Sequence, residues 1–332
     1  MNRPKISDVA KVAGVSNSTV SYVINNGPRN VSDETRLRVL SVIEELGYHP
    51  HAAARNLRKG NTQTIGFLVQ SLKSAYVSNL VDSVEKYLTK KNYYLILAIA
   101  HEDLERESYM INALANQSID GLLFIPTSCE NGYLINRLIQ SEMPVVLVDR
   151  NIKDVAADLV MTDNVEAAKV ATNYLIQNGC QRIMCISFSK EASSAIDRVE
   201  GYKQALTENK IPLDEKYISN FQYDSDESIE KLLLENIQQS GLPDGIMCTT
   251  DTIFIDVIKS LKKNGIRIPD QVIVTGSFYN SPWNDLLEPP LPVVSQNYDL
   301  MAKHAVEFLI DRINGNKESP RIKMVDASFF NM

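Results

Sequence analysis

The chain has 332 residues, of which 44% are hydrophobic and 23% are charged. This length exceeds one ordinary domain and predicts two or three, and the composition excludes global disorder. The net charge of −7 is unevenly spread, because residues 1–60 carry nine Lys and Arg against five Asp and Glu while the remainder is acidic. A basic end on an acidic body is typical of a nucleic-acid-binding head attached to a sensor domain.

The sequence lacks the signals of membrane proteins, secreted proteins and common enzymes. No apolar run reaches the roughly 18 residues of a membrane span, and the N-terminus lacks the apolar core of a signal peptide, so we expect a cytoplasmic protein without membrane contact. No phosphate loop, dinucleotide-binding glycine motif, nucleophile elbow or zinc-protease motif occurs, so no catalytic residue is predicted. The four histidines and four cysteines lack metal-ligand spacing, which predicts no metal, no cofactor and buried reduced thiols.

The first 25 residues predict two short helices joined by a tight turn. Ser7 is expected to cap a helix over about 8–13, and Ser16 to cap a second helix over about 17–25. Between them, Gly14 supplies the positive φ that a tight interhelical turn needs. This pattern is typical of a helix-turn-helix. Its predicted buried seam consists of Val9, Val15, Val20 and Val23.

A third helix is predicted to begin after Ser32, which can cap it, and to end at Gly47. Asp33 and Glu34 lie in its first turn, where the helix dipole favours negative charge. Its apolar residues recur at three- and four-residue steps and should face the other two helices. This expected stripe is Val39, Leu40, Ile43 and Leu46.

The second helix carries polar residues that suit the reading of DNA. Asn can bind adenine through paired hydrogen bonds, and Ser and Tyr can reach bases or phosphates. A three-helix packing module without a role on DNA is the alternative. The candidate DNA contacts in this region are Ser16, Asn17, Ser18, Thr19, Ser21, Tyr22 and Asn25.

Residues 49–60 predict a helix that forms only when something holds it. Good helix formers span only about eight residues there, and isolated helices shorter than ~12 residues are marginal in water. Leu57 is the one large apolar side chain, and Arg55 and Arg58 flank it. An apolar wedge beside arginines suits insertion into a minor groove, although a plain linker is an equal alternative on these residues alone.

From residue 64 onward, short apolar runs alternate with amphipathic segments, and the series restarts near residue 182. Such alternation predicts parallel sheets with right-handed crossovers, here in two similar lobes. The fold class expected is therefore α/β, with two doubly wound parallel-sheet lobes preceded by a small all-α helix-turn-helix domain. The predicted strands are 65–69, 94–98, 121–125, 145–148, 182–186, 246–248 and 272–274.

In open sheets of this kind a ligand binds beyond the carboxyl ends of the strands, so residues just after strands are candidates for a shared cleft. Polar groups around aromatic rings suit a sugar-like ligand. For any single residue, a solvated or helix-capping role is the alternative. The candidates are Ser71, Tyr76, Arg150, Asp163, Arg198, Asp251 and Gln296.

Five segments of the chain resemble the lactose/galactose-repressor (LacI/GalR) family, and the similarity extends over nearly the whole sequence. The segments are Asp8–Ser16, Thr19–Asn25, Val31–Arg36, Glu45–Tyr48 and Ala54–Arg58. The resemblance implies a periplasmic-binding-protein-like core, base-reading roles for Asn17, Ser18 and Tyr22, and a hinge-helix leucine at Leu57 that opens the centre of the operator.

The resemblance also implies ligand contacts, with departures from the family pattern. Tyr76 and Tyr223 fall where the family places aromatic rings around its ligand, and Arg198 and Asp251 match its recurrent polar contacts. Phe278, a further candidate for the site, lies in a segment that departs from the usual Gly-Phe-Asp. The other departures are Gln222, Thr250 and the tail over 327–330.

The resulting prediction is a sequence-specific DNA-binding transcriptional repressor controlled by a small molecule, a sugar or sugar derivative. It would bind double-stranded operator DNA as a homodimer, since no tetramerising heptad tail follows the core. A solute-binding protein of a transport system is the runner-up, and a two-lobed enzyme is a third class. The expected domains are a head over 1–48, a hinge over 49–60 and a core over 61–332, with a first lobe over about 61–162 and 295–319 and a second over about 163–294 and 320–332.

Overall fold

The computed structural model describes residues 4–25, 31–48, 62–188, 191–221, 228–276, 278–279 and 281–331. It divides into two compact units, Met1–Thr62 and Gln63–Met332. Within the described ranges, no helix combines the length and the apolarity that a membrane crossing requires.

In the described part of the N-terminal unit, three helices surround a small apolar core. Gly14 at φ 66° ends the first helix in the left-handed conformation, and Gly47 at φ 58° ends the third in the same way. Val9, Val20 and Val23 are buried in the shared core, as the sequence predicts. The helices are α1 (Ile6–Ala13), α2 (Asn17–Asn25) and α3 (Asp33–Leu46).

Two details of this head differ from the prediction. The first helix begins at Ile6, and Ser7 lies inside it. At its N-terminus the backbone N–H of Lys5 donates to Asp8 Oδ2 at 2.7 Å. On the third helix Leu40 is 46% exposed, and Val42 is buried instead. Counted from Val39, the steps of three, four and seven residues reach positions 42, 43 and 46, so Leu40 faces away from the core.

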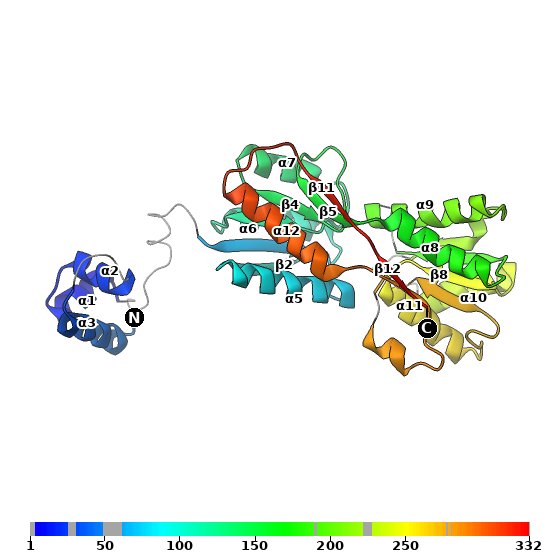
Figure 1. The fold of residues 1–332 in the computed structure, drawn as a ribbon, viewed down its shortest axis with the longest axis horizontal. Coiled ribbons are helices and arrows are strands. Elements are labelled where there is room, and N and C mark those ends of the chain that lie inside the picture. Colours follow the sequence, from blue (N-terminus) through cyan, green and yellow to red (C-terminus); the bar gives the residue numbers. More distant parts are fainter. Residues whose placement is uncertain are drawn as a thin grey trace. The chain divides into compact units, whose positions relative to one another are not determined.

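The first lobe of the C-terminal unit is a six-stranded parallel sheet in the order β11-β5-β4-β3-β1-β2 (Figure 1). Helices α5 and α12 cover one face of the sheet, and α6 and α7 cover the other. Both faces are buried, which explains why the inner strands are continuous apolar runs. The elements are β1 (Thr64–Val69), α5 (Ala75–Lys90), β2 (Tyr94–Ile99), α6 (Leu104–Ala115), β3 (Gly121–Phe124), α7 (Gly132–Gln140), β4 (Val145–Val148), β5 (Asp158–Thr162), α12 (Tyr298–Ile313) and β11 (Ile322–Val325).

The second lobe repeats this plan with a four-stranded parallel sheet in the order β7-β6-β8-β9. A separate antiparallel pair, β10 and β12, packs beside it. The elements are α8 (Asn164–Gln177), β6 (Ile183–Ser187), α9 (Ser193–Glu208), η1 (Glu215–Tyr217), β7 (Ile218–Asn220), α10 (Ile229–Ser240), β8 (Gly245–Cys248), α11 (Asp251–Lys263), β9 (Ile273–Gly276), η2 (Pro282–Leu286), β10 (Val293–Ser295) and β12 (Ser328–Phe330).

The last crossing between lobes lies later than the sequence predicts. Strand β11 pairs with β5 of the first sheet, so the chain leaves the first lobe after Val325 and not near Pro320. The physical reason is that β5 is otherwise an edge with unpaired backbone groups, which β11 covers.

The cysteines also depart from expectation at one position. Cys180, Cys185 and Cys248 are buried free thiols, whereas Cys129 is exposed in the loop after β3.

Candidate functional site

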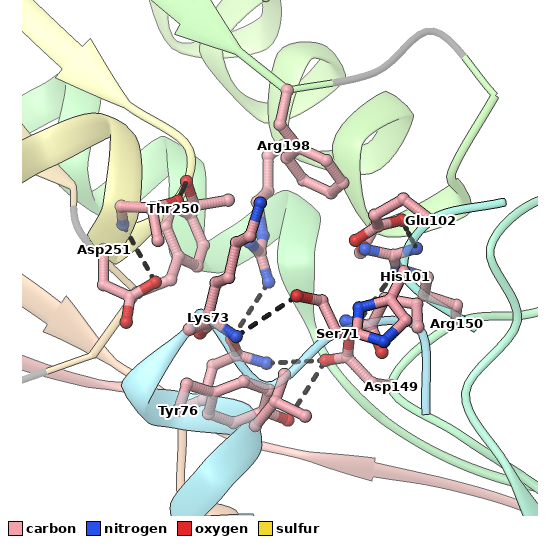
Figure 2. A pocket seen from close by; sticks show the side chains of 18 residues that line it. Ser71, Lys73, Tyr76, His101, Glu102, Asp149, Arg150, Arg198, Thr250 and Asp251 are labelled. Atoms are coloured by element: carbon pink, nitrogen blue, oxygen red, sulfur yellow. Dashed lines mark hydrogen bonds and ion pairs between the residues drawn. The ribbon is translucent and has the colours of Figure 1, made fainter. Parts of the chain in front are cut away.

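A cavity lies between the two lobes of the C-terminal unit, where the carboxyl ends of the strands meet (Figure 2). The space it outlines is about 770 Å³, which includes open solvent at its mouth. The region that the strand-end rule predicts therefore contains a cavity. The predicted residues that line the cavity are Ser71, Tyr76, Arg150, Arg198, Asp251, Phe278 and Gln296.

Two predicted ligand contacts are not placed there. Asp163 does not line the cavity; its Oδ1 accepts from the backbone N–H of Glu166 at 3.0 Å and so caps α8. A polar residue between a strand and a helix can either bind a ligand or cap the helix. Only the tertiary structure distinguishes these two roles. Tyr223 lies outside the described residues, as does Gln222 before it.

The sequence analysis missed several lining residues. Gln70 follows β1, His101 and Glu102 follow β2, and Phe188 follows β6, so the strand-end rule applied to every strand would have found them. Lys73 and Ser194 come from loop and helix positions with no such signal.

Arg198 on α9 stands at the centre of the cavity wall and is 3% exposed. Its Nε donates to Asn164 Oδ1 at 2.7 Å, its Nη1 to the carbonyl of Thr249 at 2.6 Å and its Nη2 to Gln296 Oε1 at 3.0 Å. The guanidinium also lies 3.9 Å from the ring centre of Phe278. Burial lowers the pKa of Arg198 to about 10, so the group stays charged at neutral pH.

Asp149 organises the wall on the first lobe. Its Oδ1 accepts from the hydroxyl of Tyr76 and from Nε2 of Gln296, each at 3.0 Å. Burial, together with the charge of Asp149, raises the pKa of Tyr76 well above its usual range, so the phenol remains a donor. The wall is thus built from hydrogen bonds between segments that are far apart in the sequence.

Direct hydrogen bonds also join the two lobes beside the cavity. Asp251 Oδ2, at the start of α11, accepts from the backbone N–H of Ala75 at 2.8 Å and so caps α5 of the opposite lobe. Ser193 Oγ accepts from the backbone N–H of Asn151 at 2.8 Å. Burial raises the pKa of Asp251, and the hydrogen bonds that the carboxylate accepts offset only part of this rise. A ligand that alters these contacts changes how the lobes meet.

The charged groups around the cavity balance each other. Three cations face it, Lys73, Arg150 and Arg198, together with three carboxylates, Glu102, Asp149 and Asp251. Within the described part of the chain, no group of three or more His, Cys, Asp or Glu side chains is arranged to hold a metal ion.

Backbone strain gathers at the same place. His101 and Glu102 have φ values of 59° and 61°, Asp149 has 64° and Phe278 has 58°. Residues other than glycine rarely adopt this left-handed conformation, and it clusters at functional sites.

The second candidate site is the N-terminal end of α2 in the head. Ser16 Oγ accepts from the backbone N–H of Thr19 at 3.1 Å, and Asn17 and Ser18 are exposed. Thr19, Ser21 and Tyr22 are half-buried. The side chain of Asn25 and the residues Arg55, Leu57 and Arg58 lie outside the description.

Comparison with known families covers both units. The model of the bacterial regulatory proteins of the lacI family matches residues 5–51. The model of periplasmic binding proteins and the sugar binding domain of the LacI family matches residues 62–332.

Individual proteins are similar over almost the whole chain. The HTH-type transcriptional repressor PurR of Vibrio atlanticus is 33% identical over 319 residues, 96% of this chain and 94% of that one. The ribose operon repressor of Haemophilus influenzae is 32% identical over 332 residues, 97% of this chain and 96% of that one.

Solved structures share the fold. The cellobiose complex of the transcriptional regulator CelR has a TM-score of 0.74 at 26% identity, over 99% of both chains. The Lac repressor dimer bound to operator and the anti-inducer ONPF has a TM-score of 0.83 at 19% identity, over 99% of this chain and 98% of that one. The predicted fold class and family resemblance are confirmed. The chain belongs to the lacI family of bacterial regulatory proteins and is a DNA-binding transcriptional regulator, not an enzyme.

Proposed function

We propose that this regulator is a cytoplasmic repressor that binds a pseudo-palindromic operator as a homodimer, and that a neutral sugar in the cleft controls its affinity for DNA. The observation that carries the proposal is the cavity whose walls come from both lobes, which hydrogen bonds join beside it. A ligand there biases lobe closure, and closure is coupled to the heads through the chain that joins the two units.

The charge balance of the cavity favours an uncharged, polyhydroxylated effector. A hydroxyl both donates and accepts, which matches a wall of alternating cations, carboxylates and amides. A phosphorylated ligand would instead face the carboxylates of Glu102, Asp149 and Asp251. The ribose operon repressors and the cellobiose-bound regulator among the similar proteins support a sugar.

A nucleobase is the rival effector, because its planar ring could stack on the aromatic side chains of the cavity. Stacking a base needs open aromatic faces. The guanidinium of Arg198 covers one face of Phe278 at 3.9 Å, and that of Arg150 lies 5.1 Å from the ring centre of Phe188. These two rings each have a guanidinium beside them, and the third Phe or Tyr ring among the described lining residues, Tyr76, is held through its hydroxyl by Asp149. This arrangement favours a sugar over a stacked base.

A thermal-shift panel tests the effector with D-ribose, cellobiose, hypoxanthine, guanine and ribose 5-phosphate. A ligand at 100 times its Kd stabilises the folded protein by about 2.7 kcal/mol, which raises Tm measurably. We expect a neutral sugar to raise Tm and to change operator affinity in a fluorescence-anisotropy titration. Stabilisation by a purine base alone would contradict the sugar assignment.

In the head, we assign base and phosphate contacts to Ser16, Asn17, Ser18, Thr19, Ser21, Tyr22 and Asn25. Two heads would read half-sites about 34–36 Å apart. We assign the hinge to 49–60, with Leu57 as the wedge and Arg55 and Arg58 beside it. The Leu57→Ala variant should fold normally and lose operator affinity in a gel-shift assay, whereas unchanged affinity would remove the wedge role.

We place the subunit interface on the first lobe, at the edge strand β2. Tyr94 of β2 is 74% exposed, Tyr109 of the neighbouring α6 is 69% exposed and Leu97 is 37% exposed. An apolar groove runs between this strand and α6, lined in part by Ile96, Leu97 and Met110. Exposed apolar side chains along a sheet edge are typical of a protein interface.

A further inference from the structure

Glu107 on α6 is a carboxylate with no exposed surface that does not line the cavity. Its Oε2 accepts from the backbone N–H of Thr127 at 2.6 Å, and its Oε1 accepts from Nδ2 of Asn131 at 2.8 Å. Burial raises the pKa of Glu107, while these hydrogen bonds and the charge of Arg150 act in the opposite direction. A buried carboxylate is costly unless a positive group compensates it, so Arg150 becomes the relevant partner.

A single peptide group connects the two charges. The N–H of the peptide between Pro126 and Thr127 donates to Glu107, and the C=O of the same peptide accepts from Nη1 of Arg150 at 3.0 Å. Both hydrogen bonds involve an ionised group, which makes them shorter and stronger than neutral ones. Aligned hydrogen bonds of this kind polarise each other. The Glu107 carboxylate therefore strengthens the hydrogen bond from the Arg150 guanidinium to the Pro126 carbonyl.

The rest of the Arg150 guanidinium faces the cleft. Figure 2 shows it beside Asp149, His101 and Glu102 at the cavity wall. Its Cζ lies 5.1 Å from the ring centre of Phe188 in the second lobe. Its buried Nε is 4.0 Å from Asp149 Oδ2, too far for a hydrogen bond, and has no hydrogen-bond partner among the described residues. This N–H is therefore buried and unpaired beside the cavity, and its hydrogen-bonding capacity is left for a group that binds there.

We propose that Glu107 is a positioning residue of the effector site, which fixes the Arg150 guanidinium through the peptide of residues 126 and 127 so that the Nε–H faces the bound ligand. The inference rests on the proposed effector role of Arg150 and adds a residue from outside the cleft. The competing role is purely structural, because Asn131, the other partner of Glu107, stands at the start of α7.

The test observes Arg150 itself by NMR of the ¹⁵N-labelled full chain. Loss of one Nε–H resonance in Arg150→Lys assigns that resonance. Glu107→Gln keeps the size and one acceptor oxygen but removes the charge. We expect the Arg150 Nε–H signal to shift and its exchange with solvent to accelerate on the order of tenfold, because one charge-assisted hydrogen bond becomes neutral.

Asp158→Asn is the matched control, because Asp158 is another fully buried carboxylate of the same lobe and binds Arg312 and Arg321. It should move the resonances of those two arginines and leave that of Arg150 unchanged. An unchanged Arg150 signal in Glu107→Gln, or an equal change in both variants, would overturn the proposal. If Glu107→Gln does not fold, Glu107→Asp keeps the charge, shortens the reach and gives the same readout.

Calorimetric titration with D-ribose separates this proposal from the proposed function. If Glu107 acts through Arg150, Glu107→Gln weakens D-ribose binding in the wild-type background and not in the Arg150→Lys background. Equal D-ribose affinity of wild type and Arg150→Lys would instead contradict the effector role of Arg150. Absence of D-ribose binding would contradict ribose as the effector, and the ligand-free resonance measurement would then decide the positioning role alone.

Discussion

Arg198 holds together groups from α8, from the end of β8 and from the segment after β10, and lysine cannot replace it. Lysine offers a point charge without the planar fork that serves Asn164, Thr249 and Gln296 at once. We expect Arg198→Lys to weaken binding of the stabilising sugar about 10- to 100-fold in a calorimetric titration.

The matched control for this substitution is Arg182→Lys in the same lobe. The Arg182 side chain is 54% exposed and pairs with Asp244. Surface ion pairs contribute about 0–1 kcal/mol, so sugar affinity should stay unchanged. A similar loss in both variants would mean that Arg198 acts only on the stability of the lobe.

Asp158 forms buried ion pairs with Arg312 and Arg321 that stabilise the first lobe. Burial by itself would raise its pKa, but hydrogen bonds from Arg312 and Arg321 outweigh burial and lower it. Asp158→Asn should cost about 3 kcal/mol of unfolding free energy in urea denaturation at neutral pH.

The pH dependence of this difference has a definite sign. Because the folded-state pKa of Asp158 lies below its unfolded value, the stabilisation is complete above about pH 4 and is lost as pH falls through the folded-state pKa. The stability difference between wild type and Asp158→Asn should therefore shrink under acid conditions. A difference that grows as pH falls would contradict the assignment.

At the scale of elements, α8 and α9 approach closely because Gly201 has no side chain. A Cβ at this position would overlap the carbonyl oxygen of Val165 and lie 2.9 Å from Cβ of Ala168. We expect Gly201→Ala to lower the unfolding free energy by about 1–3 kcal/mol, because backbone atoms cannot yield as side chains do.

Gly132→Ala is the comparison for that variant. Its Cβ would meet only methyl groups of Ile152 and Val155, the nearer at 2.9 Å, and side chains can rotate away. When both variants are compared with wild type by urea denaturation, Gly132→Ala should lose less unfolding free energy than Gly201→Ala. Equal losses would show that helix packing at Gly201 is looser than the structure indicates.

For the whole molecule, the proposed interface predicts that Leu97→Asp disrupts the homodimer. An unpaired carboxylate buried between subunits is strongly unfavourable. Sedimentation should show a monomer. Thermal denaturation should show an unchanged melting profile of the C-terminal unit, and operator binding should be weaker. Asp substitution of exposed Leu286, on η2 of the second lobe, is the control and should leave the dimer intact. A dimeric Leu97→Asp protein would place the interface elsewhere.

Operator binding by the basic head should depend steeply on salt. Residues 1–60 carry an excess of cations although the whole chain is acidic. Proteins that make several phosphate contacts lose about 10³-fold or more in affinity between about 50 and 200 mM salt. Anisotropy titrations of the full chain test this, and a nearly flat dependence would argue against phosphate contacts by the head.

The sequence by itself determined the elements whose signals are local. Gly14, Gly47 and Ser32 end or begin helices where the pattern predicts, because capping and positive φ depend on a few neighbouring residues. Inner parallel strands such as β4 are continuous apolar runs, because both faces of the sheet are buried. Strand ends then indicated the region of the cleft.

Only the tertiary structure decided which polar residues share that cleft and what each of them does. Asp163 and Asp251 both stand at the start of a helix after a strand, yet Asp163 caps its own helix while Asp251 caps α5 of the opposite lobe. The tertiary structure alone also decided the pairing of β11 with β5 and the hydrogen bonds that link Glu107 to Arg150. These contacts join residues up to 176 positions apart, so no local pattern contains them.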